Sequence, residues 1–155
     1  MGMDVYGKKA KSGVGEYFRN NVWWWHSLWE YCEKIAPDII PKDNCGHSND
    51  GWGLSCNGSL LLSERLTSLL ESGKVKKYEE KYTKELSELP DEQCTICGGT
   101  GYRLPPPNVG PGNIKCNGCE GKGKVKNYRA SYPFSEKNVE VFRDFLRDCG
   151  GFKIC

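Results

Sequence analysis

Two short stretches, CTICGGTG at residues 94–101 and CNGCEGKG at residues 116–123, share the pattern C-x-x-C-x-G-x-G. Two residues between paired cysteines let a tight turn aim both sulfurs at one ion, and the glycines allow backbone N–H groups to approach the sulfurs. The intervening loop is long enough to carry the second pair beside the first. The pattern therefore predicts one structural Zn²⁺ ion in a closed tetrahedral site. The four predicted ligands are Cys94, Cys97, Cys116 and Cys119.

The same cysteines have a second interpretation as a redox dithiol. A single C-x-x-C motif near a βαβ pattern is typical of thioredoxin-like exchange. No such pattern surrounds these pairs, and two matched pairs favour joint metal ligation. We therefore expect a metal site rather than thiol exchange.

The segment GEYFRNNVWWWHSLWEYCEKIAP at residues 15–37 is the strongest helix candidate outside the cysteine module. Its apolar residues recur at helical spacing, and Pro37 marks its end. Trp23 and Trp24 fall off the main stripe, so we expect a central core helix that is contacted on several sides. The alternative is an exposed aromatic patch that binds a partner. The stripe consists of Val22, Trp25, Trp29 and Cys32, extended by Phe18, Leu28 and Ile35.

Further helices are predicted on both sides of the cysteine module. Residues 59–90 predict two amphipathic helices, the first with Ser59 as N-cap and Gly73 as its stop. Near the end of the chain, another helix is expected to start after Ser135 and to end at Gly150.

These elements predict an α+β protein, with a small α-rich domain and a zinc-knuckle β-hairpin inserted into it or packed against it. Residues 1–90 form the expected helical core region, with a long loop at residues 37–58. Residues 91–129 form the four-cysteine module, and residues 130–155 are expected to pack a C-terminal helix back on the core.

The long loop at residues 37–58 is rich in turn residues, and loops of this length are often functional. It offers a further candidate site, and an enzyme that uses residues 45–56 is one alternative function. Ser-Asn-Asp-Gly at residues 48–51 is also an ordinary turn sequence. A second metal site that includes Cys32 is less expected than buried or free thiols. The candidate loop residues are Cys45, His47, Asn49, Asp50 and Cys56.

Composition narrows the class of protein. The chain has 155 residues, 37% of them hydrophobic, and a formal net charge of +2, which is too small to indicate nucleic-acid binding by itself. Nine cysteines are an odd number, which argues against a complete disulfide framework. The first residues lack an apolar signal region, and no apolar run is long enough to cross a bilayer. We expect a cytoplasmic protein with no membrane partner.

The cysteine module carries a one-sided charge. Between Tyr102 and Arg129, the basic residues are opposed only by Glu120, and two tyrosines lie among them. Such a surface can bind an acidic protein, or it can contact phosphates and stack single-stranded bases. A third interpretation is that the lysines merely keep the hairpin soluble. The residues concerned are Tyr102, Arg103, Lys115, Lys122, Lys124, Lys126, Tyr128 and Arg129.

The repeated C-x-x-C-x-G-x-G pattern resembles the cysteine-rich region of DnaJ-type chaperones. That family has four such repeats and two zinc ions, whereas this chain has two repeats, which allow one ion. The chain also lacks the His-Pro-Asp tripeptide of a J domain. The resemblance therefore implies a zinc-pinned β-hairpin, and the missing tripeptide argues against a co-chaperone role.

A second resemblance extends over nearly the whole chain. MDVYGKKAKSGVGEYFRNNVWWW, HSNDGWGLS, the paired cysteine motifs and FLRDCGGFKI look like a family of uncharacterised bacterial and phage proteins. This resemblance implies a small protein that inhibits or modulates host or defence machinery in the host cytoplasm.

Together, these observations predict a zinc-stabilised binding protein without catalytic activity. A protein partner is the leading expectation, and a nucleic-acid-binding module is the first alternative. An enzyme built on the loop at residues 45–56 is the second alternative.

Overall fold

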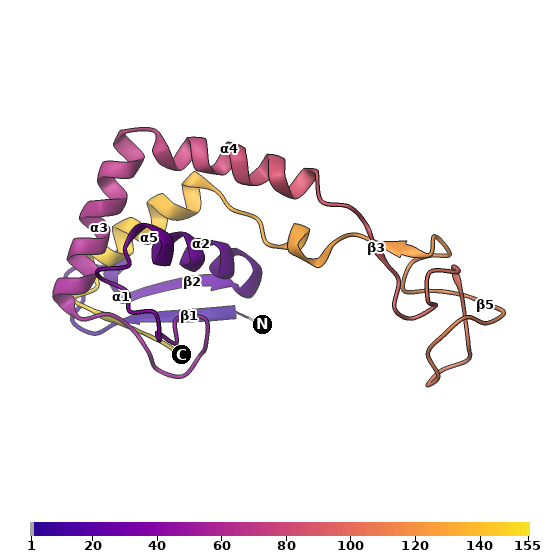
Figure 1. Cartoon of the computed structure of the whole chain (residues 1–155). Helices are drawn as coiled ribbons and strands as arrows, with labels where there is room; N and C mark the ends of the chain where they lie inside the picture. Colours follow the sequence, from indigo (N-terminus) through magenta and orange to yellow (C-terminus); the bar gives the residue numbers. More distant parts are fainter. Residues whose placement is uncertain (1) are drawn as a thin grey trace. The chain divides into compact units, whose positions relative to one another are not determined.

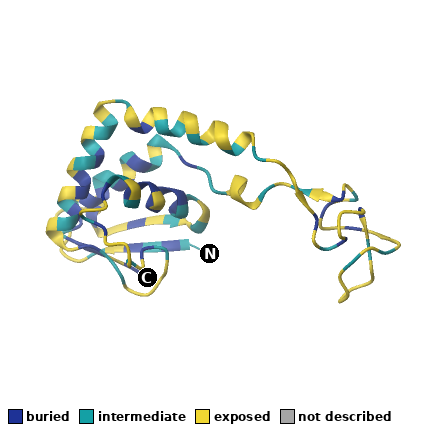
Figure 2. Cartoon of the chain, in the orientation of Figure 1, coloured by how far each residue is buried: buried dark blue, intermediate teal, exposed yellow. Residues whose placement is uncertain are grey.

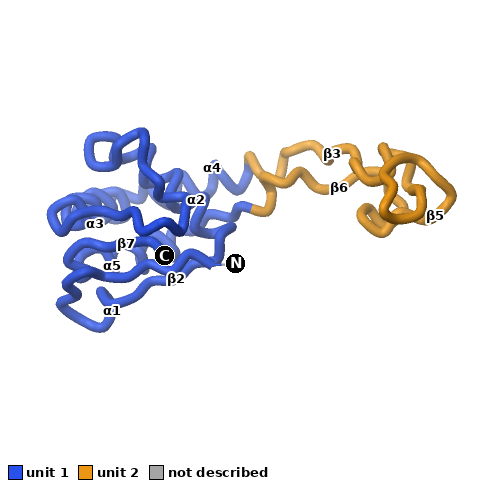
Figure 3. Tube along the Cα trace, turned by 90° about the horizontal axis from the view of Figure 1, so that it is seen from below, with its two compact units in different colours: residues 1–84, 132–155 blue, residues 85–131 orange. Residues whose placement is uncertain are grey.

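The computed structural model describes residues 2–155, and the chain divides into two compact units (Figure 3). Unit 1 consists of residues 2–84 and Tyr132–Cys155, and unit 2 consists of Glu85–Ser131. Unit 2 is therefore an insertion in the chain of unit 1. Helices and antiparallel strands both occur, which confirms the predicted α+β class.

Unit 1 contains a three-stranded antiparallel sheet in the order β2-β1-β7 (Figure 1). The strands are β1 (Gly2–Gly7), β2 (Tyr17–Asn21) and β7 (Phe152–Ile154). Val5 of β1 lies opposite Phe18 of β2 and Ile154 of β7, and all three side chains are buried. Because side chains alternate between the faces of a strand, this register gives the sheet one apolar face.

The helices of unit 1 bury their apolar sides in one core with that face. They are α1 (Gly13–Glu16), α2 (Val22–Ile35), α3 (Cys56–Glu71), α4 (Lys74–Ser87), whose last turn belongs to unit 2, and α5 (Glu136–Asp148). Trp25 and Trp29 stack at 5.4 Å between ring centroids, and Phe142 meets Trp25 edge-on at 5.5 Å. Figure 2 shows buried residues on β1, α2 and α5, whereas α4 is mostly exposed. The Trp-rich helix is thus a core helix.

The predicted helix at residues 15–37 is wrong at its start, because residues 17–21 form strand β2. Asn21 ends this strand and caps α2, its side-chain oxygen accepting from Trp24 N at 3.0 Å. Phe18 would be buried in the core in a helix or in a strand, so helical periodicity alone did not distinguish between these two conformations. The strand forms because β1 pairs with it, a contact that local spacing does not reveal.

The other helix boundaries agree with the sequence except at one cap. Ser55, not Ser59, caps α3, its Oγ accepting from Gly58 N at 3.1 Å, and Ser59 is buried one turn further along. Ser135 caps α5 as predicted, with 3.1 Å between its Oγ and Asn138 N. Gly73 has a φ of +69°, as expected for a residue that ends a helix.

Unit 2 contains two short antiparallel pairs and a 3-10 turn. β3 (Glu92–Gln93) pairs with β6 (Lys124–Val125), β4 (Tyr102–Arg103) pairs with β5 (Ile114–Lys115), and η1 is Tyr128–Ser131. Its buried cluster consists of the four cysteines, with Ile96 and Val125 packed against them. Unit 2 therefore has almost no apolar core of its own.

Candidate metal centre

The two cysteine stretches adopt the same local fold, offset by 22 residues. Gly99 N donates to Cys94 O at 3.1 Å, and Gly121 N donates to Cys116 O at 3.0 Å. The two turns also bond to each other reciprocally: Cys94 N donates to Gly123 O at 2.9 Å, and Cys116 N donates to Gly101 O at 2.8 Å. These cross-links place the two cysteine pairs around one common centre.

The four cysteine sulfurs lie within 4.8 Å of one another, and all four residues are buried. Cys94 Sγ is 3.9 Å from Cys116 Sγ, and Cys97 Sγ is 3.7 Å from Cys119 Sγ. A disulfide needs sulfurs about 2.05 Å apart, so none of these thiols is bridged. Four buried thiols that converge in this way can hold a metal ion.

Backbone N–H groups are aimed at two of the sulfurs. Gly101 N donates to Cys97 Sγ at 3.3 Å, and Gly123 N donates to Cys119 Sγ at 3.2 Å. Burial opposes ionisation of the Cys97 thiol, but the hydrogen bonds from Gly101 and the neighbouring thiols lower its pKa to about 6. At Cys116, burial dominates and raises the thiol pKa. The Cys97 side of the site thus stabilises a thiolate, the form that binds a metal.

Glycine is required where the two turns cross. Gly101 and Gly123 have φ values of +80° and +74°. A Cβ atom on Gly101 would lie 2.3 Å from Gly121 O, and one on Gly123 would lie 2.2 Å from Gly99 O. Any side chain at either position would push the two turns apart, so the last glycine of each motif is needed for packing as well as for backbone conformation.

The structure distributes the predicted partner-binding residues over several exposed parts of unit 2. Tyr102 of β4 lies directly opposite Lys115 of β5, and both are exposed. Arg103 donates from Nη1 to Asn117 Oδ1 at 2.9 Å, and Lys122 Nζ lies 3.2 Å from Glu120 Oε2. Lys124 is on β6, Lys126 follows that strand, and Tyr128 and Arg129 are in η1.

The sequence marks the loop between the cysteine motifs as a candidate recognition surface or a spacer, and the structure exposes three apolar residues there. Leu104, Val109 and Ile114 are 37%, 65% and 48% exposed. They lie in or beside the proline-containing loop that joins β4 to β5, and Leu104 N donates to Gly110 O at 3.1 Å within it. Their position in the proline-containing stretch LPPPNVGPGNIK, residues 104–115, between the two cysteine motifs was the available signal.

The candidate loop residues of unit 1 come together only in part: Asp50 lies near Cys45 and its charge raises the pKa of that thiol. Cys45 and Cys56 are exposed, whereas Cys32 is fully buried and its thiol pKa is raised by that burial. Within residues 2–155, the four-cysteine group is the only cluster of three or more potential metal ligands. Asp50 Oδ1 accepts from Trp52 N at 3.2 Å, as in an ordinary turn, and Asn49 Nδ2 donates to Gly2 O at 3.3 Å.

His47 has a neighbour that sequence reasoning did not connect to it. Its ring lies 4.4 Å from the ring of His26 between centroids, and its Nε2 is 3.3 Å from Glu33 Oε2. Its Nδ1 is buried and has no hydrogen-bond partner among residues 2–155. Burial and, after it, the charge of His47 lower the pKa of His26. The chain contains two histidines, and tertiary packing brings both together.

No family model matches the chain, and neither a curated protein nor a solved structure matches it. Among residues 2–155, no helix has the length and apolar character needed to cross a membrane.

Proposed function

We propose that this protein is a non-enzymatic binding protein in which unit 2 is held by one structural zinc ion and presents a surface to a protein partner. The observation that supports the zinc is the set of sulfur distances. A tetrahedral site with Zn–S bonds of about 2.3 Å has S···S edges of about 3.8 Å. Two of the four edges between the cysteine pairs, Cys94–Cys116 and Cys97–Cys119, measure 3.9 Å and 3.7 Å.

The chemistry of the donor set favours zinc as well. Four thiolates in a tetrahedral arrangement are typical of zinc or iron–sulfur sites, and the spacing of these pairs is that of zinc knuckles. Four protein ligands leave no coordination position for a substrate. The ion's contribution is therefore stability, because it connects two turns that have little apolar surface to bury.

The exposed apolar residues near the tip of unit 2 support a protein as the partner. Leu104, Val109 and Ile114 offer aliphatic surface, and Arg103 and Lys115 lie on the adjoining strands. Apolar residues bordered by positive charge complement a protein surface with apolar and acidic groups. A phosphate backbone attracts the lysines electrostatically but makes no comparable favourable contact with the aliphatic side chains.

Nucleic acid remains the second candidate because of the lysines of β6 and its surroundings. Among residues 2–155, no ion-pair partner is found for Lys115, Lys124 or Lys126. Cations of this kind release counterions from a phosphate backbone on binding. The two candidates differ in which residues of unit 2 carry the affinity.

Metal content tests the first half of the proposal. The purified protein is expected to contain one zinc ion per chain by plasma mass spectrometry, and Cys97→Ser is expected to lose it. Cys45→Ser, which removes an exposed thiol of unit 1, is the matched control and keeps the zinc. A folded protein without bound metal would refute the zinc assignment.

Two variants test the second half. A triple variant, Leu104→Ser with Val109→Ser and Ile114→Ser, is expected to lose proteins that co-purify with the wild type from cells of the source organism. A Lys115→Gln, Lys124→Gln and Lys126→Gln variant is expected to keep most of them. Labelled single-stranded and duplex oligonucleotides serve as the nucleic-acid probe. Binding that falls steeply with salt and is lost in the lysine variant would replace the protein partner with nucleic acid.

A further inference from the structure

The sheet of unit 1 has two edges, and the chain covers one of them. Residues 51–54 run along the outer side of β7. Ile154 N donates to Trp52 O at 2.8 Å, Gly51 N donates to Ile154 O at 2.8 Å, and Phe152 N donates to Leu54 O at 3.1 Å. This extended segment satisfies the backbone groups that β7 turns away from β1.

The other edge is strand β2, and its outward groups follow from the hydrogen bonding of β1. Cys155 N donates to Asp4 O at 2.8 Å, so Asp4 faces β7 and its neighbours Met3 and Val5 face β2. Their partners Asn20 and Phe18 therefore bond toward β1. The backbone groups of the alternate β2 residues must then point away from the sheet.

These alternate residues are Tyr17 and Arg19. Within residues 2–155, no hydrogen-bond partner is found for their backbone N–H and C=O groups. An unpaired edge is a template for another strand, and proteins usually cover it or blunt it. The covered edge at β7 and the open edge at β2 belong to the same sheet.

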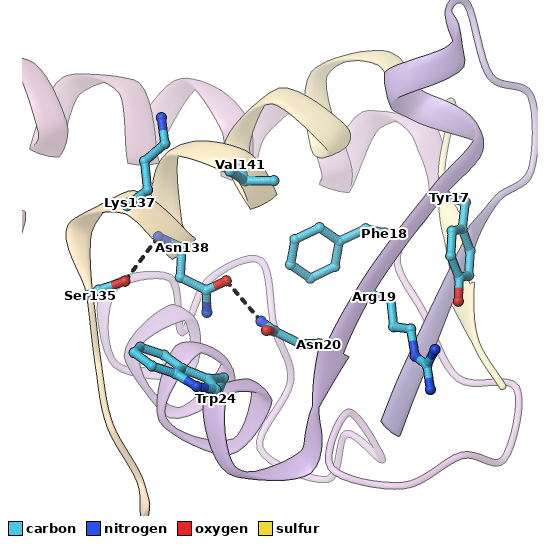
Figure 4. A pocket seen from close by; sticks show the side chains of 9 residues that line it. All are labelled: Tyr17, Phe18, Arg19, Asn20, Trp24, Ser135, Lys137, Asn138 and Val141. Atoms are coloured by element: carbon cyan, nitrogen blue, oxygen red, sulfur yellow. Dashed lines mark hydrogen bonds between the residues drawn. The ribbon is translucent and has the colours of Figure 1, made fainter. Parts of the chain in front are cut away.

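A cavity of about 440 Å³ lies along the open edge (Figure 4). Phe18 and Asn20 point from β2 toward α5, whereas Tyr17 and Arg19 lie on the opposite side of the strand. A pocket on one face of a strand would contact alternate residues, but this one contacts four in succession, so it follows the edge. The lining residues are Tyr17, Phe18, Arg19, Asn20, Trp24, Ser135, Lys137, Asn138 and Val141.

The first half of α5 forms the opposite wall of this cavity, which we call the β2–α5 groove. Val141 is 45% exposed there, and Phe18 and Trp24 add aromatic surface. Asn20 Nδ2 donates to Asn138 Oδ1 at 2.9 Å. This pairing leaves Asn20 Oδ1 as an acceptor and Asn138 Nδ2 as a donor, which together match the N–H and C=O of a peptide group.

Charge narrows the class of ligand. Arg19 and Lys137 line the groove, and none of the lining residues that the structure describes is a carboxylate. The existing ion pairs of these cations, with Asp4 and Glu140, are at exposed positions where such pairs contribute little. The Arg19 side chain lies on the opposite side of β2, so Lys137 is the lining cation that an acidic ligand meets in the groove.

We propose that unit 1 binds an extended acidic peptide segment in the β2–α5 groove. The main chain of the peptide adds a fourth strand beside β2, and its side chains contact Phe18, Trp24 and Val141. Strand addition to a sheet edge obtains affinity from backbone hydrogen bonds and specificity from pockets for alternate side chains. This site is separate from unit 2 and does not depend on the metal.

A displayed library of random eight-residue peptides is the first probe, used with the full-length wild-type protein. Selection is expected to enrich peptides that combine Asp or Glu with Val, Ile or Thr. Affinities are then measured by fluorescence anisotropy with labelled synthetic copies of the selected peptides. If selection yields no binding peptide, the proposal is overturned.

Methylation of the peptide backbone tests the binding mode. In a peptide strand beside β2, every second N–H faces the protein. N-methylation at these positions is expected to weaken binding at least tenfold, whereas methylation at the intervening positions has little effect. A profile without this period of two would exclude strand addition.

Protein variants locate the site. Val141→Arg places a bulky cation in the groove and is expected to weaken binding at least tenfold. Val14→Arg makes the same change at another exposed valine, outside the groove, and is expected to leave binding unchanged. Equal affinity of both variants would overturn the proposal. So would a dimer in light scattering that Val141→Arg abolishes, because a second copy would then be the occupant.

Discussion

The buried clusters of the two units differ in composition. Among the described residues of unit 1, 22 hydrophobic residues form one buried cluster that includes Trp25, Trp29 and Phe142. In unit 2, the buried cluster consists of four cysteines. Chains of about 40 residues or fewer usually need disulfides, metals or a partner, because too little of their surface is buried on folding. The insertion of 47 residues, from Glu85 to Ser131, lies close to that limit.

With the proposed metal ion in unit 2, the difference means that the two units of one chain are stabilised in different ways. Apolar packing is spread over many contacts in unit 1, so no single group is indispensable there. In unit 2, the proposed metal ion would connect four cysteines, and each of them would be needed. Intrinsic tryptophan fluorescence reports on unit 1 alone, since all five tryptophans lie between Trp23 and Trp52 in that unit. Each unit can therefore be perturbed and observed separately.

The largest effect is expected from the metal ligands. Cys97→Ser, or chelation of the metal, is expected to unfold unit 2, because a structural zinc contributes on the order of 10 kcal/mol to folding. Backbone amide resonances of residues 92–125 would lose their dispersion in a heteronuclear NMR spectrum. Tryptophan fluorescence of unit 1 should stay unchanged. If it changed together with the NMR signals, the two units would not be independent.

A substitution in the core of unit 1 tests whether that unit can be destabilised while unit 2 keeps its metal. Phe142→Ala is expected to lower the free energy of unfolding of unit 1 by about 3–5 kcal/mol, because it leaves a cavity beside Phe18 and Trp25. Urea denaturation followed by tryptophan fluorescence measures this loss. The exposed neighbour Val141 supplies the control, and Val141→Ala should cost less than about 1 kcal/mol. Zinc stoichiometry should remain at one per chain in both variants.

A smaller effect is expected at the crossing of the two cysteine turns. Gly101→Ala brings a Cβ atom to 2.3 Å from Gly121 O, so the turns must separate and the metal affinity is expected to fall at least tenfold. Gly98→Ala has a similar backbone angle, but its Cβ comes no closer than 3.6 Å to its neighbours. That variant should cost only the left-handed penalty of about 1–2 kcal/mol. Chelator competition compares the two, and equal affinities would contradict the requirement for close approach.

The smallest effect concerns the histidine pair. The pKa of His26 is lowered by burial and then by His47, against the attraction of Glu30 and Glu33. The unfolded chain therefore takes up this proton first, below a pH of about 6.5, and the stability of unit 1 declines as the pH falls through that value. His26→Gln is expected to reduce the decline between about pH 7 and pH 5. Urea midpoints at both pH values measure it, and an unchanged slope would exclude His26 as the titrating group.

The cysteine site was predictable in its members but not in its supporting contacts. Two C-x-x-C pairs followed by glycines imply a shared ion, because the spacing itself aims the sulfurs. The reciprocal bonds between Cys94 and Gly123 and between Cys116 and Gly101 depend on how the two turns meet. No local sequence pattern predicts how the two turns contact each other, although the repeated glycines indicated that backbone groups approach closely there.

The strands were the least predictable part of the fold. β2 looked like the beginning of a helix because Phe18 continues the apolar stripe of residues 22–35. Its conformation depends on β1, and β1 in turn pairs with β7, about 150 residues further along the chain. Strand propensity is largely a matter of packing against neighbours, so isolated segments of three to six residues give little signal.

The sequence alone determined the four cysteines of the candidate metal site, the α+β class and the ends of several helices, because each depends on residues close together in the chain. Tertiary structure decided the three-stranded sheet, the meeting of His26 with His47, and the open edge at β2. These features require segments far apart in sequence to be placed side by side. Only the folded chain shows that residues 51–54 cover one edge of the sheet and that no segment among residues 2–155 covers the other.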